Sequence, residues 1–513
     1  MLRHCPHVRM KVRRLKVFLL FLIMLCVLLL WRHYHVLYNR LLVRDLGSSV
    51  NFWTRTTRTN HWEPSGDQRI LDGGVCRSPE CDNEDRRDEK QAAPANPDTM
   101  TYNLPDPKGP SGDLHKRNFL LRDDPTEFFV RTKSGATCFR KGTDMVSLKA
   151  GESRRKILHA HQEETRSDQG NSSLEKRLAN CMCRPGWHGP HCGIPTMIQH
   201  SNIPFKGRLM PRKVPRRVIN AININHEFDL LHARFHELAD TVDLFLVCES
   251  NFTAYGSSKE LNFLRFLLNG TFNYMRHKIL YVFLDHFPEG GRQNGWIADD
   301  YLRTFLSHDG MSRVKGIRPD DVFLINDADE IPAREGILFL KLYDGWTEPV
   351  SIHLRKSLYG FFWKQPGTLN ILSACTVAML FSVYNGDGIL LRRREYFSMP
   401  GFSAYENKSG QILLKWSIGS PIHYAGWHCS WCFAPEGIYY KLVAAQNGDF
   451  PRWGSFPEKR DLTYIKNLIR TGGWFDGSVE QYPPTDPKEP MYAPKYMLNN
   501  LQRYGYILQN PYA

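Results

Sequence analysis

The stretch Val322-Phe-Leu-Ile-Asn-Asp-Ala-Asp-Glu-Ile-Pro332 is an apolar, strand-like run that ends in two aspartates, Asp327 and Asp329. Residues two apart in extended backbone point to the same side, so both carboxylates can reach one cation. A hard divalent cation held by oxygen ligands keeps coordination positions that a substrate diphosphate can fill. This is the only Asp-x-Asp in the chain, and its place at a strand end favours a metal site over two solvated aspartates in a turn. The stretch therefore indicates metal-dependent transfer from a sugar nucleotide.

Strand and helix patterns alternate on both sides of this stretch. Alternation of this kind predicts an α/β fold, a Rossmann-type and mostly parallel sheet with helices on both faces. Ligands bind such sheets at the carboxyl ends of the strands, where Asp327 and Asp329 fall. The sequence predicts strands at 218–224, 244–249, 278–284, 322–326 and 350–355, and helices at 227–238, 296–306, 435–446 and 461–471.

The N-terminus carries an uncharged apolar run at 17–31, preceded by five basic residues between Arg9 and Lys16. A cleaved signal peptide needs small residues at its exit, and the run ends in Leu-Leu-Leu-Trp-Arg-His-Tyr-His. We therefore expect a single transmembrane helix that acts as a type II signal anchor. Because the denser positive charge lies before the run, residues 1–16 should stay cytosolic and the remainder should be lumenal.

The formal net charge is +14, but residues 1–60 alone contribute +10 of it. The basicity therefore belongs mostly to the targeting signal, and no nucleic-acid partner is expected.

Cysteines and glycosylation sequons agree with this orientation. Cys5 and Cys26 fall before or within the apolar run, which leaves ten of the 12 cysteines on the lumenal side, where disulfides form. Sequons for N-glycosylation occur at Asn171, Asn251, Asn269 and Asn407, all beyond the anchor.

The segment from Cys181 to Cys192 resembles the C-terminal half of an EGF-like module. That likeness implies a Cys183–Cys192 disulfide, while Cys181 needs an upstream partner such as Cys138. A zinc site with His188 and His191 is the less favoured alternative in an oxidising compartment.

Three kinds of residue are candidates for the chemistry. His428 is a candidate third metal ligand, preferred over His423, although a packed histidine beside tryptophans is the competing interpretation. Glu330 and Glu436 are candidates for the general base that deprotonates the acceptor hydroxyl. Asn223, Asn225 and Glu249 stand at the ends of the first strands, where a nucleotide would dock or where ordinary caps occur.

Two further clusters stand out. The arginines at 392–394 could face a diphosphate or form a solvated charge run. Cys429 and Cys432 form a Cys-x-x-Cys without a thioredoxin-like context, so we expect structural disulfides there, with Cys248 or Cys375 as possible partners.

Five segments carry a further signal: 216–230, 247–256, 327–332, 356–364 and 425–432. Together they resemble glycosyltransferase family 17, and the likeness extends from about residue 180 to the C-terminus. The resemblance implies a GT-A-like fold and a Golgi membrane enzyme that transfers N-acetylglucosamine from UDP-N-acetylglucosamine, with inversion. It also implies Mn²⁺ or Mg²⁺ as cofactor and the core β-mannose of N-glycans as acceptor, joined in β1,4 linkage as the bisecting branch. One departure is Asn326, where the family pattern has an aspartate; it leaves the Asp327/Asp329 pair intact.

Three alternatives stay open: another UDP-sugar-dependent lumenal glycosyltransferase, a glycoside hydrolase with two carboxylates across the scissile bond, and an EGF-bearing lectin. The oligomeric state is not predicted. The expected organisation is a cytosolic tail at 1–16, the anchor at 17–31, a stem at 32–135, an EGF-like disulfide element at 136–195, a catalytic domain at 196–480 and a segment at 481–513 that wraps over the surface.

Overall fold

The computed structural model describes residues 114, 116–132, 135–147, 181–444 and 452–513. The predicted anchor at 17–31 and the sequon at Asn171 lie outside these residues. Within the described ranges, none of the helices combines the length and apolar character needed to cross a bilayer.

A nine-stranded sheet forms the centre of the fold, in the order β12-β17-β14-β15-β11-β7-β8-β9, with β16 beside β14. The four strands β11, β7, β8 and β9 run parallel, as predicted, whereas β15 enters antiparallel between β11 and β14. The strands are β7 (Val218–Asn223), β8 (Leu244–Ser250), β9 (Ile279–Leu284), β11 (Val322–Ile325), β12 (Glu330–Pro332), β14 (Val350–Leu358), β15 (Gly360–Thr376), β16 (Trp416–Ile418) and β17 (Gly426–Ser430).

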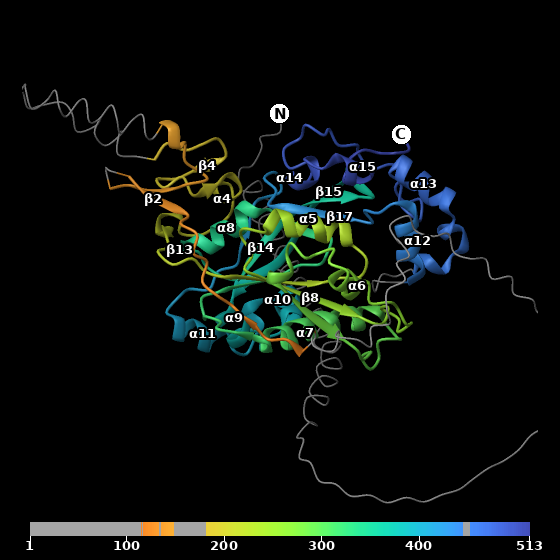
Figure 1. Cartoon of the computed structure of the whole chain (residues 1–513), viewed down its shortest axis with the longest axis horizontal. Coiled ribbons are helices and arrows are strands. Elements are labelled where there is room, and N and C mark those ends of the chain that lie inside the picture. The colour runs from red at the N-terminus through yellow and green to blue at the C-terminus, as the bar shows by residue number, and fades with distance from the viewer. Residues whose placement is uncertain (1–113, 115, 133–134, 148–180, 445–451) are drawn as a thin grey trace, which may run out of the picture. The chain divides into compact units, whose positions relative to one another are not determined.

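Alternate side chains of each parallel strand enter two separate cores, as the period of two requires. In β11, Val322 and Leu324 join one core, while Phe323 and Ile325 join the other. The first core also takes Phe235 of α5 (Phe228–Leu238), and the second takes Leu306 of α7 (Gly295–Ser312). Figure 1 shows α5 on one side of the sheet, with α7, α9 and α10 on the other. The sheet is therefore covered on both faces.

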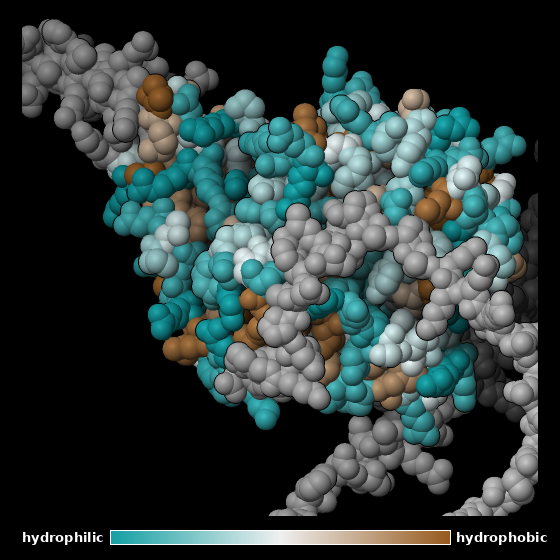
Figure 2. Space-filling view, turned by 45° about the vertical axis from the view of Figure 1, so that its right-hand side comes forward, coloured by the Kyte–Doolittle hydropathy of each residue, from teal (hydrophilic) through white to brown (hydrophobic). Residues whose placement is uncertain are grey.

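The other helices are α4 (Thr196–Gln199), α6 (Asn262–Leu268), α8 (Arg334–Leu342), α9 (Val377–Val383), α10 (Gly388–Arg393), α11 (Phe402–Ser409), α12 (Pro435–Ala444), α13 (Leu462–Thr471), α14 (Lys495–Leu498) and α15 (Leu501–Leu508). All the strands and helices that the sequence predicted are confirmed. Most ends agree within about three residues, whereas α7 continues to Ser312 instead of ending at 306. Hydrophobic residues dominate the two cores, and on the face shown in Figure 2 the described surface is mainly hydrophilic, with smaller hydrophobic patches.

The prediction that residues 481–513 wrap over the surface misses their contribution to the interior. Met497, Tyr504, Ile507 and Leu508 are buried and pack against Leu230 and Ala233 of α5. Figure 1 shows α14 and α15 beside α5. The prolines of this segment argued against helices in the sequence, yet the short helices α14 and α15 form there.

The end of the predicted stem also differs from expectation. Strand β1 (Phe119–Leu120) pairs in parallel with β10 (Val314–Lys315), and Leu121 is buried. Residues 119–121, which the sequence assigned to the stem, therefore pack against the fold rather than extending from it.

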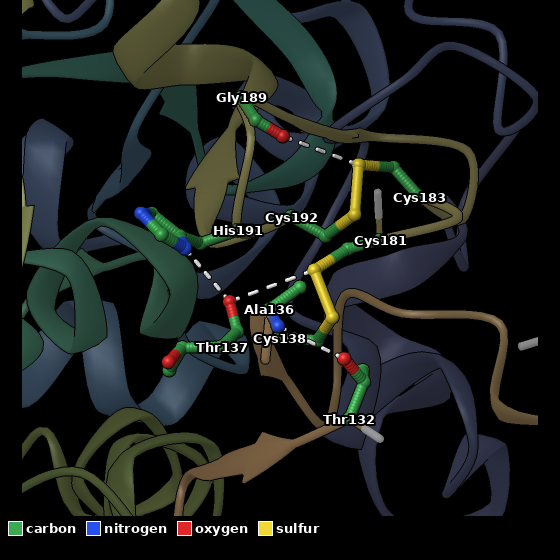
Figure 3. The surroundings of a disulfide bond; sticks show 9 residues. All are labelled: Thr132, Ala136, Thr137, Cys138, Cys181, Cys183, Gly189, His191 and Cys192. Carbon is green, nitrogen blue, oxygen red and sulfur yellow. Dashed lines mark hydrogen bonds between the residues drawn. A yellow bond between two sulfur atoms is a disulfide. The ribbon is translucent and has the colours of Figure 1, made fainter. Parts of the chain in front are cut away.

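Two disulfides, Cys138–Cys181 and Cys183–Cys192, tie together the small hairpins β2–β3 and β4–β5. Both pairings are those expected from the sequence. His191 Nδ1 lies 2.7 Å from the carbonyl oxygen of Thr137, which links the two disulfide-bonded parts (Figure 3). The strands involved are β2 (Phe129–Arg131), β3 (Thr137–Phe139), β4 (Trp187–His188) and β5 (Ile194–Pro195); β6 (Met210–Pro211) and β13 (Tyr343–Asp344) pair separately.

Candidate active site

Two segments about 100 residues apart meet at the carboxyl end of β11. The chain leaves β11 at Ile325 and turns through Asp327 and Asp329 into β12, which pairs antiparallel with β17. Glu330 lies opposite His428 in this pairing, and the Cys429 N–H donates to the Asp329 carbonyl oxygen at 3.0 Å. The register fixes His428 beside the acidic turn.

Asp327 is held by two arginines. Arg303 of α7 donates from Nε and Nη2 to the two carboxylate oxygens of Asp327, each at 2.9 Å, and Arg392 of α10 approaches at 3.3 Å. Burial by itself would raise the pKa of Asp327, but the two guanidinium groups outweigh it and hold that pKa well below its usual range. Asp327 is thus an ionised carboxylate in a paired state.

Glu330 is buried, with 3% of its surface exposed. Arg392 donates to both of its carboxylate oxygens, at 2.9 and 3.0 Å, and the Asp327 N–H donates to Oε2 at 2.9 Å. Both oxygens are occupied, so this geometry favours a role in positioning Arg392 and the acidic turn over the predicted role of general base. Beneath the turn, Arg234 of α5 donates to the carbonyl oxygens of Asp327 and Glu330.

Asp329 faces different partners. Its Oδ2 lies 3.7 Å from His428 Nε2. Burial would raise the pKa of Asp329, but His428 and Lys441 lower it below its usual range. Burial alone would lower the pKa of His428, but the neighbouring Asp329 carboxylate outweighs burial and raises that pKa above its usual value. The Asp329 carboxylate and the His428 imidazole, which could serve as an oxygen and a nitrogen ligand of a metal ion, therefore lie side by side.

The predicted metal-binding set is only partly assembled. Asp329 and His428 have donor types that suit Mn²⁺, and His428 Nδ1 is buried with no hydrogen-bond partner among the described residues. The Asp327 carboxylate is instead engaged by its arginines. In the part of the chain that the structure describes, no three acidic, histidine or cysteine side chains form a ready metal cluster.

Glu249 requires a correction. The side chain is fully buried in β8 and accepts hydrogen bonds from the N–H groups of Phe263 and Leu264, at 2.8 and 3.0 Å, and from Tyr281. It therefore caps α6 and cannot contact a nucleotide in this conformation. Asn223 and Asn225 remain at the carboxyl end of β7, and the Asn225 N–H donates to Glu227 Oε2 at 3.1 Å.

Glu436 lies half-buried in the first turn of α12 and is a neighbour of Tyr512, whose pKa is raised by burial and by the Glu436 charge. Among the described residues, no hydrogen bond or ion pair joins Glu436 to the acidic turn. The arginine cluster divides: Arg392 belongs to the site, whereas Arg393 is half-exposed and pairs with Asp300 at 2.7 Å.

The Cys-x-x-Cys also requires a correction. Cys429 and Cys432 bond to each other, while Cys248 and Cys375 are free, buried thiols. The expected disulfide is present, but the predicted partners Cys248 and Cys375 are wrong. The bond closes a tight turn directly after His428, at the edge of the candidate site.

Sequence reasoning missed Arg234, Arg303 and Lys441. Arg303 had a local signal, because Asp299 lies four residues earlier on α7 and pairs with it at 2.7 Å, but nothing in the sequence linked it to Asp327. Lys441 Nζ lies 3.7 Å from Glu227 Oε1, a partner more than 200 residues away. Of the described sequons, Asn269 and Asn407 are exposed and Asn251 is half-buried.

Comparison with known proteins identifies the family of the chain. The family model described as "Glycosyltransferase family 17" matches residues 177–369. Proteins of rat, mouse and human named beta-1,4-mannosyl-glycoprotein 4-beta-N-acetylglucosaminyltransferase are each 54% identical to the chain, over 98% of its length and 94% of theirs. Identity of this extent over nearly the whole chain, together with the family match, shows that the chain belongs to glycosyltransferase family 17.

Proposed function

We propose that the chain is an inverting transferase that moves N-acetylglucosamine from UDP-N-acetylglucosamine, in β1,4 linkage, to the core β-mannose of N-glycans. The observation that carries this proposal is the 54% identity over 98% of the chain to relatives that are named as β-1,4-mannosyl-glycoprotein 4-β-N-acetylglucosaminyltransferases. The acidic turn at the carboxyl end of β11 supplies a site where a nucleotide sugar can bind, as expected for a sheet of this kind. A GT-A-like fold belongs to the same proposal.

A divalent cation, Mn²⁺ or Mg²⁺, fits the donor types of Asp329 and His428. We propose Asp327 as the third ligand, once its arginines find other partners. When bound, the cation acts as a Lewis acid on the departing diphosphate. Arg303 and Arg392 can donate to the diphosphate oxygens, because guanidinium groups bind phosphate in two-point fashion. If the diphosphate of the sugar nucleotide replaced Asp327 as the partner of these arginines, the Asp327 carboxylate would be free to bind the cation. The metal site would then form only when the sugar nucleotide is bound.

The general base remains to be assigned between the two predicted glutamates. Glu330 is committed to Arg392 through both oxygens. Glu436 follows the Cys429–Cys432 turn at the start of α12 and is half-buried, which suits a base that must reach an acceptor hydroxyl. We therefore propose Glu436 for this role.

The proposed compartment is based on the sequence. We propose a single-pass type II Golgi membrane protein, with residues 17–31 as the anchor and the catalytic domain in the lumen. The Cys138–Cys181, Cys183–Cys192 and Cys429–Cys432 disulfides support an oxidising compartment. Exposed Asn269 and Asn407 support lumenal N-glycosylation.

The test uses the full chain in detergent with UDP-N-acetylglucosamine and a biantennary N-glycan, with Mn²⁺ or with EDTA. We expect one added N-acetylglucosamine in β1,4 linkage on the core mannose, formed only with the metal. A product bearing the sugar on another residue would refute the acceptor, and full turnover in EDTA would refute the cation. Sugar release without a nucleotide donor would indicate a hydrolase instead.

A further inference from the structure

Lys259 lies between β8 and α6, at the carboxyl end of the parallel sheet. Its backbone N–H donates to the Asn251 carbonyl oxygen at 2.9 Å, which fixes its place directly after β8. Its side-chain nitrogen is buried and has no hydrogen-bond partner among the described residues. A buried ammonium group without an acceptor is costly, and such groups are rare in folded proteins.

Two buried glutamates are the nearest acidic neighbours, yet neither bonds to Lys259. Burial lowers the pKa of Lys259, and the charges of Glu249 and Glu227 oppose that effect only in part. Both Glu249 oxygens accept from the N–H groups that start α6. Glu227 Oε2 accepts from the backbone of Asn225 and His226, and Oε1 faces Lys441. The two acids are occupied, so the three N–H groups of Lys259 remain available to a ligand.

The position of Lys259 relative to the acidic turn limits what that ligand can be. In the sheet β7 separates β11 from β8, so the end of β8 lies two strand spacings, about 10 Å, from the end of β11. A diphosphate at the Asp329 end of β11 would extend its nucleoside over β7 toward β8. Lys259 therefore lies where the nucleoside half would bind, and not where the phosphates would.

The local charge points the same way. Glu227 and Glu249 lie close enough to Lys259 to shift its titration, so two acids surround one ammonium group. A phosphate placed there would meet at least as much negative as positive charge. A neutral acceptor, such as a base carbonyl or a ribose hydroxyl, would satisfy the ammonium group without that repulsion.

We propose that Lys259 is a donor-binding residue that hydrogen-bonds a neutral oxygen of the nucleoside half of the sugar nucleotide. This inference rests on the proposed function and extends it by a residue outside the sequence motifs. The residue as a whole is partly exposed although its nitrogen is buried, so its flexible stem can bring the nitrogen to an arriving nucleoside.

The test measures binding of uridine, UMP and UDP to the full chain and to Lys259→Met, together with thermal unfolding of the free proteins. We expect all three ligands to bind about tenfold more weakly to the variant, by the same factor, because the lost bond is in the part they share. The unfolding temperature of the free variant shows separately whether the ammonium group also stabilises the buried Glu249, whose raised pKa the Lys259 charge opposes. Lys259→Gln keeps a neutral N–H donor and should recover part of the affinity.

Lys278 provides the matched control, because its ammonium group donates to the carbonyl oxygens of Ala239 and Val242 at 2.6 and 2.9 Å. Lys278→Met should lower the unfolding temperature and leave nucleotide affinity intact. Unchanged affinity in Lys259→Met with lowered stability would show a structural counter-ion and overturn the proposal. Weakening of UMP and UDP but not uridine would also overturn it, in favour of a phosphate contact. If the parent protein forms no glycan product yet Lys259→Met still weakens uridine binding, the proposed function fails and the lysine's role stands.

Discussion

At the scale of single residues, the site depends on which charge each carboxylate meets. Asp327, Glu330, Arg303 and Arg392 form one network, and Asp329, His428 and Lys441 form another. Opposite charges this close, out of full contact with water, hold one another in place because losing either partner leaves the other buried and unpaired. The two aspartates of the motif therefore have different roles before any ligand arrives.

Arg392→Met should lower the free energy of unfolding by about 3 kcal/mol, because it strands the buried Glu330 carboxylate. Chemical denaturation of the purified protein measures the change. Arg393→Met is the control, since Arg393 is half-exposed on the same helix and its pair with Asp300 should contribute less than about 1 kcal/mol. Equal losses in the two variants would contradict the central role of the Arg392–Glu330 pair.

Asp329→Asn should reduce turnover at least about 100-fold while the protein keeps its fold, because the carboxylate beside His428 is the group best placed to hold a cation. Product formation at several Mn²⁺ concentrations, with circular dichroism as the folding check, measures both effects. Asp486→Asn, an exposed residue that accepts from the Lys488 N–H, should behave like the parent protein. Parental turnover in Asp329→Asn would remove Asp329 from the metal site.

At the scale of helices and strands, prediction from sequence succeeded where the pattern is local. Strands β7, β8, β9 and β11 are short apolar runs, and α5 and α7 have helical spacing, so the parallel half was predictable. Strand β15 was missed because Pro366 and Gly367 interrupt its apolar pattern, although its partner β14 holds it in register. Helix α8 was missed because Pro332 suggested an end to the segment and no side chain caps its start.

The same reasoning explains the errors at the site. Asp327 and Asp329 could be selected because the motif and the strand are neighbours in sequence. Glu249 was misassigned because the N–H groups that it caps belong to residues 14 and 15 positions later. Arg303 and Arg392 could not be assigned to Asp327, because only the packing of α7 and α10 around β11 brings them there.

The attachment of α15 to α5 should govern a large part of the stability. Tyr504 is fully buried against α5, so Tyr504→Ala should cost about 3–5 kcal/mol. Leu501 begins the same helix with 54% of its surface exposed, and Leu501→Ala should change stability by less than about 0.5 kcal/mol. Denaturant titration of both variants tests this; a small loss for Tyr504→Ala would mean that the C-terminal helices are dispensable.

The same contact should make stability depend on pH. Burial lowers the pKa of His232 to about 4, with Arg503 and His236 adding to the effect, and its Nδ1 lies 3.2 Å from Tyr504 Oη. Between pH 6.5 and about 4 the unfolded chain binds a proton at this histidine that the folded chain does not, so stability falls as the pH falls through that window, by up to about 3 kcal/mol.

Denaturation midpoints from pH 7 to pH 4.5 measure this loss, and His232→Gln should flatten the profile. His286→Gln, which replaces an exposed histidine, serves as the matched control. A slope that is the same in all three proteins would assign the pH dependence to other groups.

At the scale of the whole described molecule, the site depends on segments from distant parts of the chain. The turn after the parallel strand β11 supplies Asp327 and Asp329. The hairpin of β14 and β15, of which β15 is antiparallel to β11, brings β17 and His428 alongside, and α12 adds Lys441. The C-terminal residues then pack on α5, whose Arg234 supports the acidic turn. Many of these contacts join distant parts of the chain. Covalent links that limit the conformational freedom of the unfolded chain should therefore stabilise the fold.

The disulfide element offers a quantitative test of that expectation. Cys138 and Cys181 are 43 residues apart and Cys183 and Cys192 only 9, so the first bond removes more conformational freedom from the unfolded chain. The chain-entropy relation gives a difference of about 1 kcal/mol between them. Cys138→Ser with Cys181→Ser should therefore destabilise the protein more than Cys183→Ser with Cys192→Ser, in denaturant titrations under non-reducing conditions. The opposite order, or equal losses, would show that packing around the element, and not the length of the closed loop, decides how much each bond contributes.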